Sequence, residues 1–522
     1  DESNNSRGTA NLDSPHTPFG AARRRPGDPR GPVAGSQTRF ECRIKRPNKL
    51  QSHRCTMQVE AGKAIVSWKQ QITGMQRTLV LDAKNTLGVD WTVRDGRAHL
   101  TVHTLTTPSP PTPVDGNSEH EVYEAQDFDS NDVAWRCCQA LQRMADTVRP
   151  FSGKGQILFV VNPVSGHQQG MELFNKVKPL FQSANVPLKV LFTTHAGHAR
   201  QIVGELDFDV TRGVVCVSGD GTVCEVLNAL MELPNRDEVL RKVLLGTVPA
   251  GSECAFGKMV SYVNPVSAAY VILKGHKTRP IDVLKIQQGE RVMYSVCGVG
   301  WGIPGKLAEE SEAMRATYGP ARYLVSGLKS FVNLRGCPGT LHVLAHQTDD
   351  ASEANTECSF GAHCQVCQEG ERQARTNSGA LQGGKPGKWL EVKGPFVMVG
   401  MLKSVKNLAP YVHLADGYVD VLAVPEIGRL ELLRRTTKIL TSTHLSDGSC
   451  LYWKACGVKL CPDNPDDKIN VDGEVLNGET IELNVIPSIL NVYVAYDEQV
   501  QKNVHSGGWT GLEGSIQEAL YM

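Results

Sequence analysis

The stretch Gly213-Val-Val-Cys-Val-Ser-Gly-Asp-Gly-Thr222 joins an apolar run to a turn that contains two glycines. Short apolar runs without polar alternation are typical of strands that are buried on both faces of a parallel sheet. Similar runs occur at Ile157–Val161, Leu188–Phe192 and Val243–Val248, and amphipathic helical patterns lie between them. This alternation predicts an α/β domain with a parallel sheet.

Glycine-containing turns follow three of these predicted strands. The first contains Asn162, Pro163, Ser165 and Gly166, the second runs from Ser218 to Thr222, and the third contains Gly251 and Ser252. A glycine in such a turn often serves only to allow a tight bend. However, turns of this kind also leave backbone N–H groups free at a helix start, where they favour a phosphate. Three in succession, each at the carboxyl end of a strand, predict an anion-binding site at that edge of the sheet.

None of these three turns is a Walker loop or a dinucleotide fingerprint, so these general nucleotide motifs do not explain them. Instead, the three turns resemble the ATP-binding loops of the diacylglycerol kinase and sphingosine kinase superfamily, over residues 150–500. The resemblance implies a lipid kinase that uses ATP and Mg²⁺. It also implies that Asp220 is the general base, whereas the alternative is a turn residue that caps its own helix. The residues implied at the nucleotide are Asn162, Pro163, Ser165, Gly166, Ser218, Gly219, Gly221, Thr222, Glu225, Gly251 and Ser252.

Two later segments extend the resemblance. Arg315 and Arg322 match positions that reach the ATP phosphates in the family, although arginines with this spacing on a helix are also typical of a charged surface. Asp472, Gly473 and Glu474 match a turn that lies near the nucleotide or organises metal and water, and an Asp-Gly hairpin turn is the alternative.

The chain departs from the family pattern at two places. Cys254 stands where the third loop usually ends in Asn or Asp, and Lys306 stands where an acid commonly follows a Trp-Gly turn. Sphingosine kinases carry two acids here, but this chain has Lys306 and Ala308. A cationic sphingoid base gains from a desolvated carboxylate and a neutral ceramide does not, so the departure favours ceramide, although Glu309 lies close by. We expect Ala308 and Glu309 to contact the lipid.

Ceramide is therefore the predicted acceptor, and sphingosine is the main alternative. Other stretches also resemble ceramide kinases more than sphingosine kinases, among them 321–329 and 413–420. Because Cys254 and Lys306 depart from the pattern, a catalytically silent lipid-binding regulator is the alternative from another class.

Cys358, Cys364 and Cys367 form a small cluster in the sequence that resembles a cysteine motif of ceramide kinases, with a wider first spacing. Together with His363 or Cys337, the three thiols have the composition of a zinc site. A redox-sensitive cluster is the alternative, and the sequence leaves both open.

The predicted domain order has five parts. Residues 1–38 are poor in aromatic and β-branched residues and predict a disordered tail. A β-rich region with a final helix follows over 39–149, and its architecture resembles a pleckstrin-homology domain. The remaining segments are an α/β ATP-binding domain over 150–278, a β-rich lipid-binding domain over 279–500 with a polar insertion at 349–388, and a tail at 501–522.

The composition limits the range of partners. The chain has 522 residues, with 55 basic and 55 acidic side chains, so its net charge indicates no nucleic-acid partner. The 15 cysteines are scattered, and no apolar run approaches the ~20 residues that cross a bilayer. We therefore expect a cytoplasmic protein, peripherally associated with an intracellular or plasma membrane. The basic amphipathic segment 429–440 is a candidate for membrane or calmodulin binding, or for a packed domain helix.

Overall fold

The protein is described by a computed structural model that divides into two compact units. The N-terminal unit contains residues up to Thr104, together with 122–146 and 180–187, and the larger unit contains the rest. The described residues are 39–45, 52–70, 73–106, 119–148, 155–250, 254–260, 264–274, 277–313, 335–345, 357–358, 364–376, 389–404, 408–440, 443–445 and 450–494. The predicted tails, 1–38 and 501–522, lie outside these ranges.

The N-terminal unit contains a sheet with the strand order β4-β3-β2-β1-β7-β6-β5. Consecutive strands from β1 to β4 pair antiparallel, as do β1 with β7 and β5 with β6. The strands are β1 (Arg39–Lys45), β2 (His53–Glu60), β3 (Lys63–Lys69), β4 (Gln76–Asp82), β5 (Thr86–Arg94), β6 (Arg97–Thr106) and β7 (Glu119–Gln126). Buried and exposed residues alternate along β1, as expected for a strand with one face on a core.

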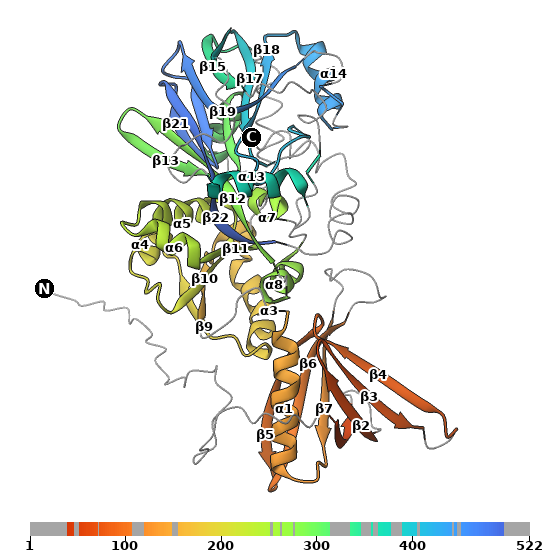
Figure 1. Ribbon diagram of the computed structural model, residues 1–522. Coiled ribbons are helices and arrows are strands. Elements are labelled where there is room, and N and C mark those ends of the chain that lie inside the picture. Colours follow the sequence, from red (N-terminus) through yellow and green to blue (C-terminus); the bar gives the residue numbers. More distant parts are fainter. Residues whose placement is uncertain are drawn as a thin grey trace, which may run out of the picture. The chain divides into compact units, whose positions relative to one another are not determined.

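Helix α1 (Asn131–Asp146) lies along this sheet (Figure 1). It begins after Ser130, whose hydroxyl accepts a hydrogen bond from the backbone N–H of Val133 at 3.2 Å and so caps the first turn. Its buried face carries Cys137, Leu141 and Met144 at helical spacing. The predicted β-rich region with a closing helix is thus present.

The larger unit begins with four parallel strands: β8 (Gln156–Val161), β9 (Leu188–Phe192), β10 (Thr211–Ser218) and β11 (Leu244–Pro249). Their order in the sheet is β9-β8-β10-β11, so the direction of winding reverses between β8 and β10. Ligands of open α/β sheets bind at such a switch point, beyond the carboxyl ends of the strands. The parallel sheet was predicted correctly, and its strand order now identifies which two loops flank the crevice.

Helices follow each of the four parallel strands. They are α2 (Ser165–Gln168), α3 (Gly170–Ser183), α4 (His198–Gly204), α5 (Asp220–Glu232), α6 (Arg236–Lys242), α7 (Ala255–Met259) and α8 (Pro265–Lys274). The described helices include none that is long and apolar enough to span a bilayer.

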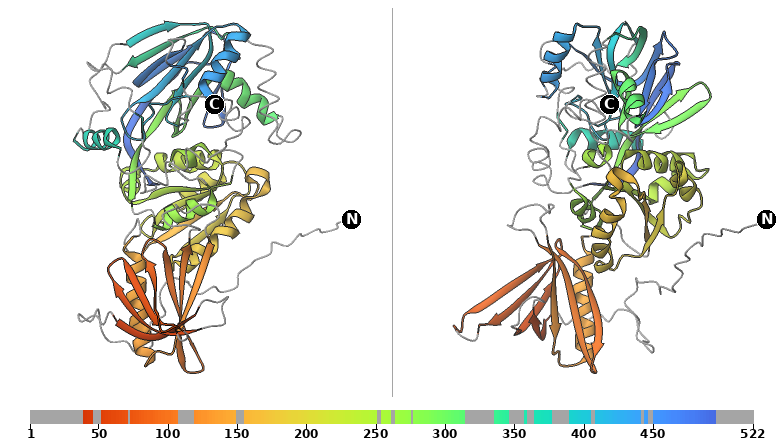
Figure 2. Two further views of the ribbon diagram at one scale, coloured as in Figure 1. Left: turned by 90° about the vertical axis from the view of Figure 1, so that its right-hand side faces the viewer. Right: turned by 180° about the vertical axis from the view of Figure 1, so that it is seen from behind.

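Antiparallel strands continue the same sheet beyond the α/β part (Figure 2). Strand β22 (Ile481–Val494) pairs antiparallel with β12 (Lys277–Gln288) and parallel with β11 through Leu245 and Val492. The other strands are β13 (Arg291–Ser295), β14 (Gly298–Gly302), β15 (Gly339–Ala345), β16 (Trp389–Lys393), β17 (Phe396–Leu402), β18 (Val419–Pro425), β19 (Leu451–Pro462), β20 (Lys468–Val471) and β21 (Glu474–Asn477). Because β12 and β22 join both parts, the α/β and β-rich segments form one compact unit.

Two glycines permit close packing where β22 crosses the parallel strands. A Cβ atom on Gly213 would lie 2.3 Å from the Tyr493 hydroxyl oxygen, and one on Gly246 would lie 2.9 Å from the Tyr493 ring. Tyr493 is fully buried, so its ring occupies the volume that these two strands leave open. The Tyr493 side chain of β22 therefore packs closely on the parallel strands β10 and β11.

Helix α9 (Ile303–Ala313) packs on β20, and α13 (Gln365–Thr376) and α14 (Arg429–Leu440) complete the described helices of the β-rich part. Helix α13 comes from the predicted polar insertion. Its residue Cys367, and also Cys358 and Cys364, are buried, so this insertion is not polar surface throughout.

Candidate active site

The first two loops meet at the switch point through side-chain hydrogen bonds. The Asn162 side-chain amide donates to the Thr222 hydroxyl at 3.3 Å, and the backbone N–H of Gly219 donates to the Ser165 hydroxyl at 3.0 Å. Ser165 and Thr222 are both buried. These contacts hold the end of β8 against the start of α5, so the first two of the three predicted loops lie together.

The N-terminus of α5 is suited to a phosphate. Its N-cap residue, Gly219, makes no side-chain capping hydrogen bond. Gly221 is exposed, and a Cβ atom built on it would meet no heavy atom within 4 Å. The free amide groups of a helix start, together with its dipole, attract anions, and the missing side chain leaves room for one to approach. The turn therefore fits the phosphates of a nucleotide.

The carboxylate of Asp220 is held by the third loop. Its Oδ2 accepts a hydrogen bond from the N–H of Ala255 at 2.8 Å, and its Oδ1 accepts one from the N–H of Phe256 at 3.0 Å. Asp220 therefore does cap a helix, but the helix is α7 and not its own α5. Of the predicted residues in this loop, Gly251 and Ser252 lie outside the described part of the chain.

Cys254 has a local structural contact. It is the N-cap residue of α7, and its sulfur accepts a hydrogen bond from the N–H of Gly257 at 3.4 Å. Cysteine thus occupies a position that Asn or Asp fills well, because their side-chain oxygens accept bonds from helix N–H groups. The departure at Cys254 preserves the cap.

Burial raises the pKa of Asp220, and the N–H donors of Phe256 and Ala255 and the charge of Lys258 oppose this rise. A carboxylate with a raised pKa accepts a proton more readily at neutral pH. The two N–H donors also fix the orientation of the carboxylate. Asp220 thus has the chemistry of a positioned general base.

Asp472 is the second carboxylate of the site and, like Asp220, is half-buried. Asp472 and Gly473 have φ angles of 47° and 95° and form the two-residue turn between β20 and β21, so the predicted Asp-Gly hairpin turn is present. The Asp472 Oδ1 accepts hydrogen bonds from the Ser295 hydroxyl at 2.8 Å and from the N–H of Gly298 at 3.0 Å, and its Oδ2 accepts one from the N–H of Val296 at 3.1 Å.

Burial raises the pKa of Asp472 to about 6, against the hydrogen bonds from Ser295, Gly298 and Val296, and the charge of Asp220 contributes to the rise. The turn therefore brings a carboxylate within electrostatic reach of Asp220. Two such carboxylates are suited to bind a cation or to accept a proton.

Other predicted nucleotide contacts have structural partners. The Glu225 carboxylate accepts a hydrogen bond from the N–H of Ala199 at 3.1 Å, in the first turn of α4. Glu474 is exposed and pairs with Arg291 at 2.8 Å. Gly166 has a φ of 63° and lies in α2, which follows Pro163. Arg315 and Arg322 lie outside the described residues.

The predicted lipid contacts lie on α9. Glu309 is 53% exposed, and its Oε1 lies 3.5 Å from the Lys468 ammonium group. Ala308 and Lys306 are on the same helix. Sphingosine kinases have two acids where this chain has Lys306 and Ala308. The neighbouring acid, Glu309, is partly neutralised by its pairing with Lys468.

The sequence did not identify the fourth residue of the cysteine cluster. Cys358, Cys364 and Cys367 lie together with His413, which comes from a segment before β18. Cys337 instead forms a β-bridge with Phe396, and His363 lies outside the described residues. Because His413 follows Cys367 by 46 residues, no local spacing pointed to it.

Comparison with known proteins gives the family of this chain. Residues 156–286 match the model of the diacylglycerol kinase catalytic domain, and residues 387–494 match the model of the YegS C-terminal NAD kinase β sandwich-like domain. Sphingosine kinase 1 of Arabidopsis thaliana is 32% identical over 345 residues, which cover 62% of this chain and 68% of the relative. Ceramide kinase of Homo sapiens is 28% identical over 431 residues, which cover 71% and 79% of the two chains.

A solved structure of a diacylglycerol kinase from Bacillus anthracis str. Sterne aligns with a TM-score of 0.47 at 18% identity, over 66% of this chain and 98% of that one. A relative named as a sphingosine kinase matches 62% of this chain, and one named as a ceramide kinase matches 65%. The chain belongs to the diacylglycerol and sphingosine kinase family of lipid kinases.

Proposed function

We propose that this lipid kinase transfers the γ-phosphoryl group of Mg-ATP to the primary hydroxyl of ceramide and so forms ceramide 1-phosphate. The observation that carries the phosphoryl-transfer part is the position of Asp220. It lies at the start of a helix where Gly221 leaves open space, and two backbone donors orient its carboxylate. Phosphoryl transfer depends mainly on such positioning and on charge neutralisation.

Each group has a distinct task in this proposal. Asp220 accepts the proton of the lipid hydroxyl as that oxygen attacks the γ-phosphorus. The amide groups around Gly221 bind the nucleotide phosphates. Asp220 and Asp472 are the carboxylates that would face a bound Mg²⁺, which would supply charge neutralisation on the phosphates. Ser295 and the N–H groups of Val296 and Gly298 hold Asp472 in place.

The choice of ceramide rests on α9. A sphingoid base is cationic and gains from an unpaired, desolvated carboxylate, and a neutral ceramide does not. Glu309 is exposed and already pairs with Lys468. This favours a neutral acceptor. Sphingosine is the alternative, because relatives named sphingosine kinase reach 32% identity and those named ceramide kinase reach 28%.

The acceptor is tested with the purified chain and labelled ATP. Ceramide, sphingosine and diacylglycerol are presented separately in mixed micelles, and the lipid products are separated. We expect phosphate transfer to ceramide in the parent and its loss in Asp220→Asn. Transfer to sphingosine alone would overturn the ceramide assignment and would leave the role of Asp220 intact.

The rival function is that of a catalytically silent lipid-binding regulator, which rests on the two departures from the family pattern, at Cys254 and Lys306. The same assay separates the two functions when vesicle binding is measured in parallel. A parent chain that transfers phosphate to none of the three acceptors, and that binds ceramide-containing vesicles as well as Asp220→Asn does, would support the regulator.

We further propose that the N-terminal unit is a pleckstrin-homology domain, since a sheet ordered β4-β3-β2-β1-β7-β6-β5 and a final helix are the parts of that fold. We also propose membrane contact through α14, where Leu430 is 85% exposed and is flanked by the exposed residues Arg429 and Arg434. Sedimentation with anionic vesicles and capture on Ca²⁺-loaded calmodulin, each with the parent and Leu430→Asp, distinguish membrane binding from calmodulin binding.

A further inference from the structure

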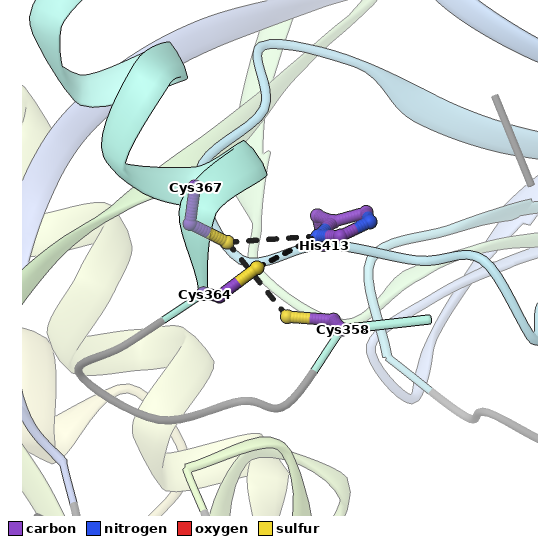
Figure 3. Close-up of side chains that lie close together, drawn as sticks. All are labelled: Cys358, Cys364, Cys367 and His413. Atoms are coloured by element: carbon purple, nitrogen blue, oxygen red, sulfur yellow. Dashed lines mark hydrogen bonds between the residues drawn. The ribbon is translucent and has the colours of Figure 1, made fainter. Parts of the chain in front are cut away.

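Four buried side chains converge beside α13 (Figure 3). The sulfur atoms of Cys358, Cys364 and Cys367 and a ring nitrogen of His413 all lie within 4.8 Å of one another. Cys358 Sγ lies 3.7 Å from Cys367 Sγ, and His413 Nδ1 lies 3.3 Å from Cys364 Sγ and 3.8 Å from Cys367 Sγ. All four side chains are 7% exposed or less.

These separations match the edges of a zinc tetrahedron. Zinc binds cysteine sulfur at about 2.3 Å and histidine nitrogen at about 2.0–2.1 Å, so ligands at tetrahedral angles lie about 3.8 Å apart for two sulfurs and about 3.6 Å apart for sulfur and nitrogen. The three separations above depart from these values by about 0.3 Å or less. A disulfide requires sulfur atoms about 2.0 Å apart, and none of these three cysteines forms one.

Two segments of the chain bring the four donors together. Cys364 directly precedes α13, and its carbonyl accepts a hydrogen bond from the N–H of Gln368. Cys367 lies in the first turn of the same helix. Two thiols three residues apart at a helix start therefore face the same point, and Cys358 approaches it from the segment before.

A close contact holds His413 opposite this helix start. A Cβ atom on Gly370 of α13 would lie 2.0 Å from the carbonyl oxygen of Ala415, so the glycine lets the helix pack directly on the segment that carries His413. On the same helix, Glu371 pairs with the buried guanidinium of Arg279 at 2.9 Å, which ties α13 to β12. The histidine thus reaches the thiols through tertiary packing.

We propose that Cys358, Cys364, Cys367 and His413 bind one Zn²⁺ in a closed structural site. Thiolate and imidazole donors select zinc over the hard cations that accompany ATP. Four protein ligands complete the tetrahedron, so no coordination position is open for a reacting molecule. Binding displaces the thiol protons into solvent, and the metal fastens α13 to the segment before β18.

Metal content is the first test. The full chain, purified under reducing conditions without a metal-affinity tag, is analysed by inductively coupled plasma mass spectrometry. We expect about one zinc per chain, and a loss of most of it in Cys367→Ser and His413→Ala. His413→Cys should retain the metal because it supplies a fourth thiolate. Cys461→Ser, at a half-buried cysteine on β19, is the matched control and should keep full zinc content.

A second measurement covers variants that do not fold. The parent chain is stripped with a chelator and titrated with Co²⁺, and the visible bands of tetrahedral thiolate cobalt report the ligand set. We expect these bands, and their bleaching by Zn²⁺. A folded, reduced parent chain that binds neither ion at this stoichiometry overturns the proposal, as does a native Cys358–Cys367 disulfide found by mass spectrometry.

Discussion

Asp220 Oδ2 lies 2.8 Å from the backbone nitrogen of Ala255 and accepts its hydrogen bond. The carboxylate that follows β10 therefore caps the helix that follows β11. With the second bond from Phe256, both oxygens of Asp220 are oriented by a loop that is 35 residues farther along the chain. The base and the third loop thus act as one unit, and a change in either is expected to disturb the other.

Replacement of Asp220 by Asn is expected to abolish most of the kinase activity. An amide does not accept the hydroxyl proton, so kcat should fall by about 10²–10⁴-fold. The NH₂ group of Asn would also face a backbone donor, which is expected to lower the free energy of unfolding by about 1–3 kcal/mol. Radiolabelled phosphate transfer and urea denaturation measure the two effects.

Glu238→Gln is the control for this substitution, because it removes an exposed carboxylate on α6 that pairs with Lys242. It should leave both quantities unchanged. Full activity in Asp220→Asn would show that Asp220 serves only as a helix cap.

The raised pKa of Asp472 should be visible in the pH dependence of stability. Its pKa in the folded chain is about 6 against an ordinary value of 3.8, so between these values the folded chain binds more protons than the unfolded chain. The parent should therefore gain stability relative to Asp472→Asn as the pH falls from about 7 to about 4, by roughly 1–3 kcal/mol. Urea denaturation of both proteins across this range checks the sign.

Protonation of Asp472 should weaken the binding of Mg-ATP, although it stabilises the folded chain. If Asp472 faces the metal-bound phosphates, the KM for Mg-ATP should rise as the pH falls through about 6, and the KM for lipid should not. A KM for Mg-ATP that stays constant down to pH about 5 would show that Asp472 does not contribute to nucleotide binding.

Gly305 should be intolerant of a side chain. A Cβ atom there would lie 1.7 Å from the Lys468 carbonyl oxygen, so alanine would push α9 away from β20. Overpacking of this kind typically costs about 1–3 kcal/mol. Thermal or urea unfolding of Gly305→Ala measures this loss, and a raised KM for lipid would link α9 to the acceptor.

Gly204→Ala is the matched control, since a Cβ atom at this helical glycine meets no heavy atom within 4 Å. Equal stability of the two variants would contradict the close packing of α9 on β20.

Lys403 should be essential for the stability of the β-rich part. It is 1% exposed, and its ammonium group donates to Asp282 at 2.9 Å and to Asp416 at 3.0 Å. Removal of one partner from a buried ion pair costs about 3–5 kcal/mol, because the remaining charges lose their compensation. Lys403→Met should therefore lower the urea midpoint sharply.

Lys459→Met tests whether burial is the cause, since Lys459 pairs with Glu482 at 2.9 Å on the surface. This variant is expected to unfold close to the parent midpoint. A small effect at Lys403 would mean that the two buried carboxylates are neutral without it.

Much of the fold was predictable because its signals are local. The apolar runs at Ile157–Val161 and Gly213–Val217 lie within β8 and β10, and the Asp472-Gly473 pair forms a hairpin turn. Side-chain periodicity and turn chemistry act over a few residues, so they can be recognised in one dimension. The order β9-β8-β10-β11 required the structure.

The partners of the site residues were not predictable in this way. The contact between Asp472 and Gly298 joins residues 174 positions apart, and Glu225 contacts α4 through Ala199. Only the pairing of β14 with β20 brings the first two together. Cys254 was recognised as a departure from the family pattern, and its capping of α7 depends on local backbone geometry that the residue type does not reveal.

By itself, the sequence determined the strands, the glycine turns and the residue types that enter the site, with Asp220 at the start of a helix. Tertiary structure decided that Asp220 caps α7, that Asp472 faces the same region, and that His413 joins the three cysteines. The physical reason is range: backbone preferences are set by near neighbours, and contacts across a folded sheet depend on strand order and helix packing.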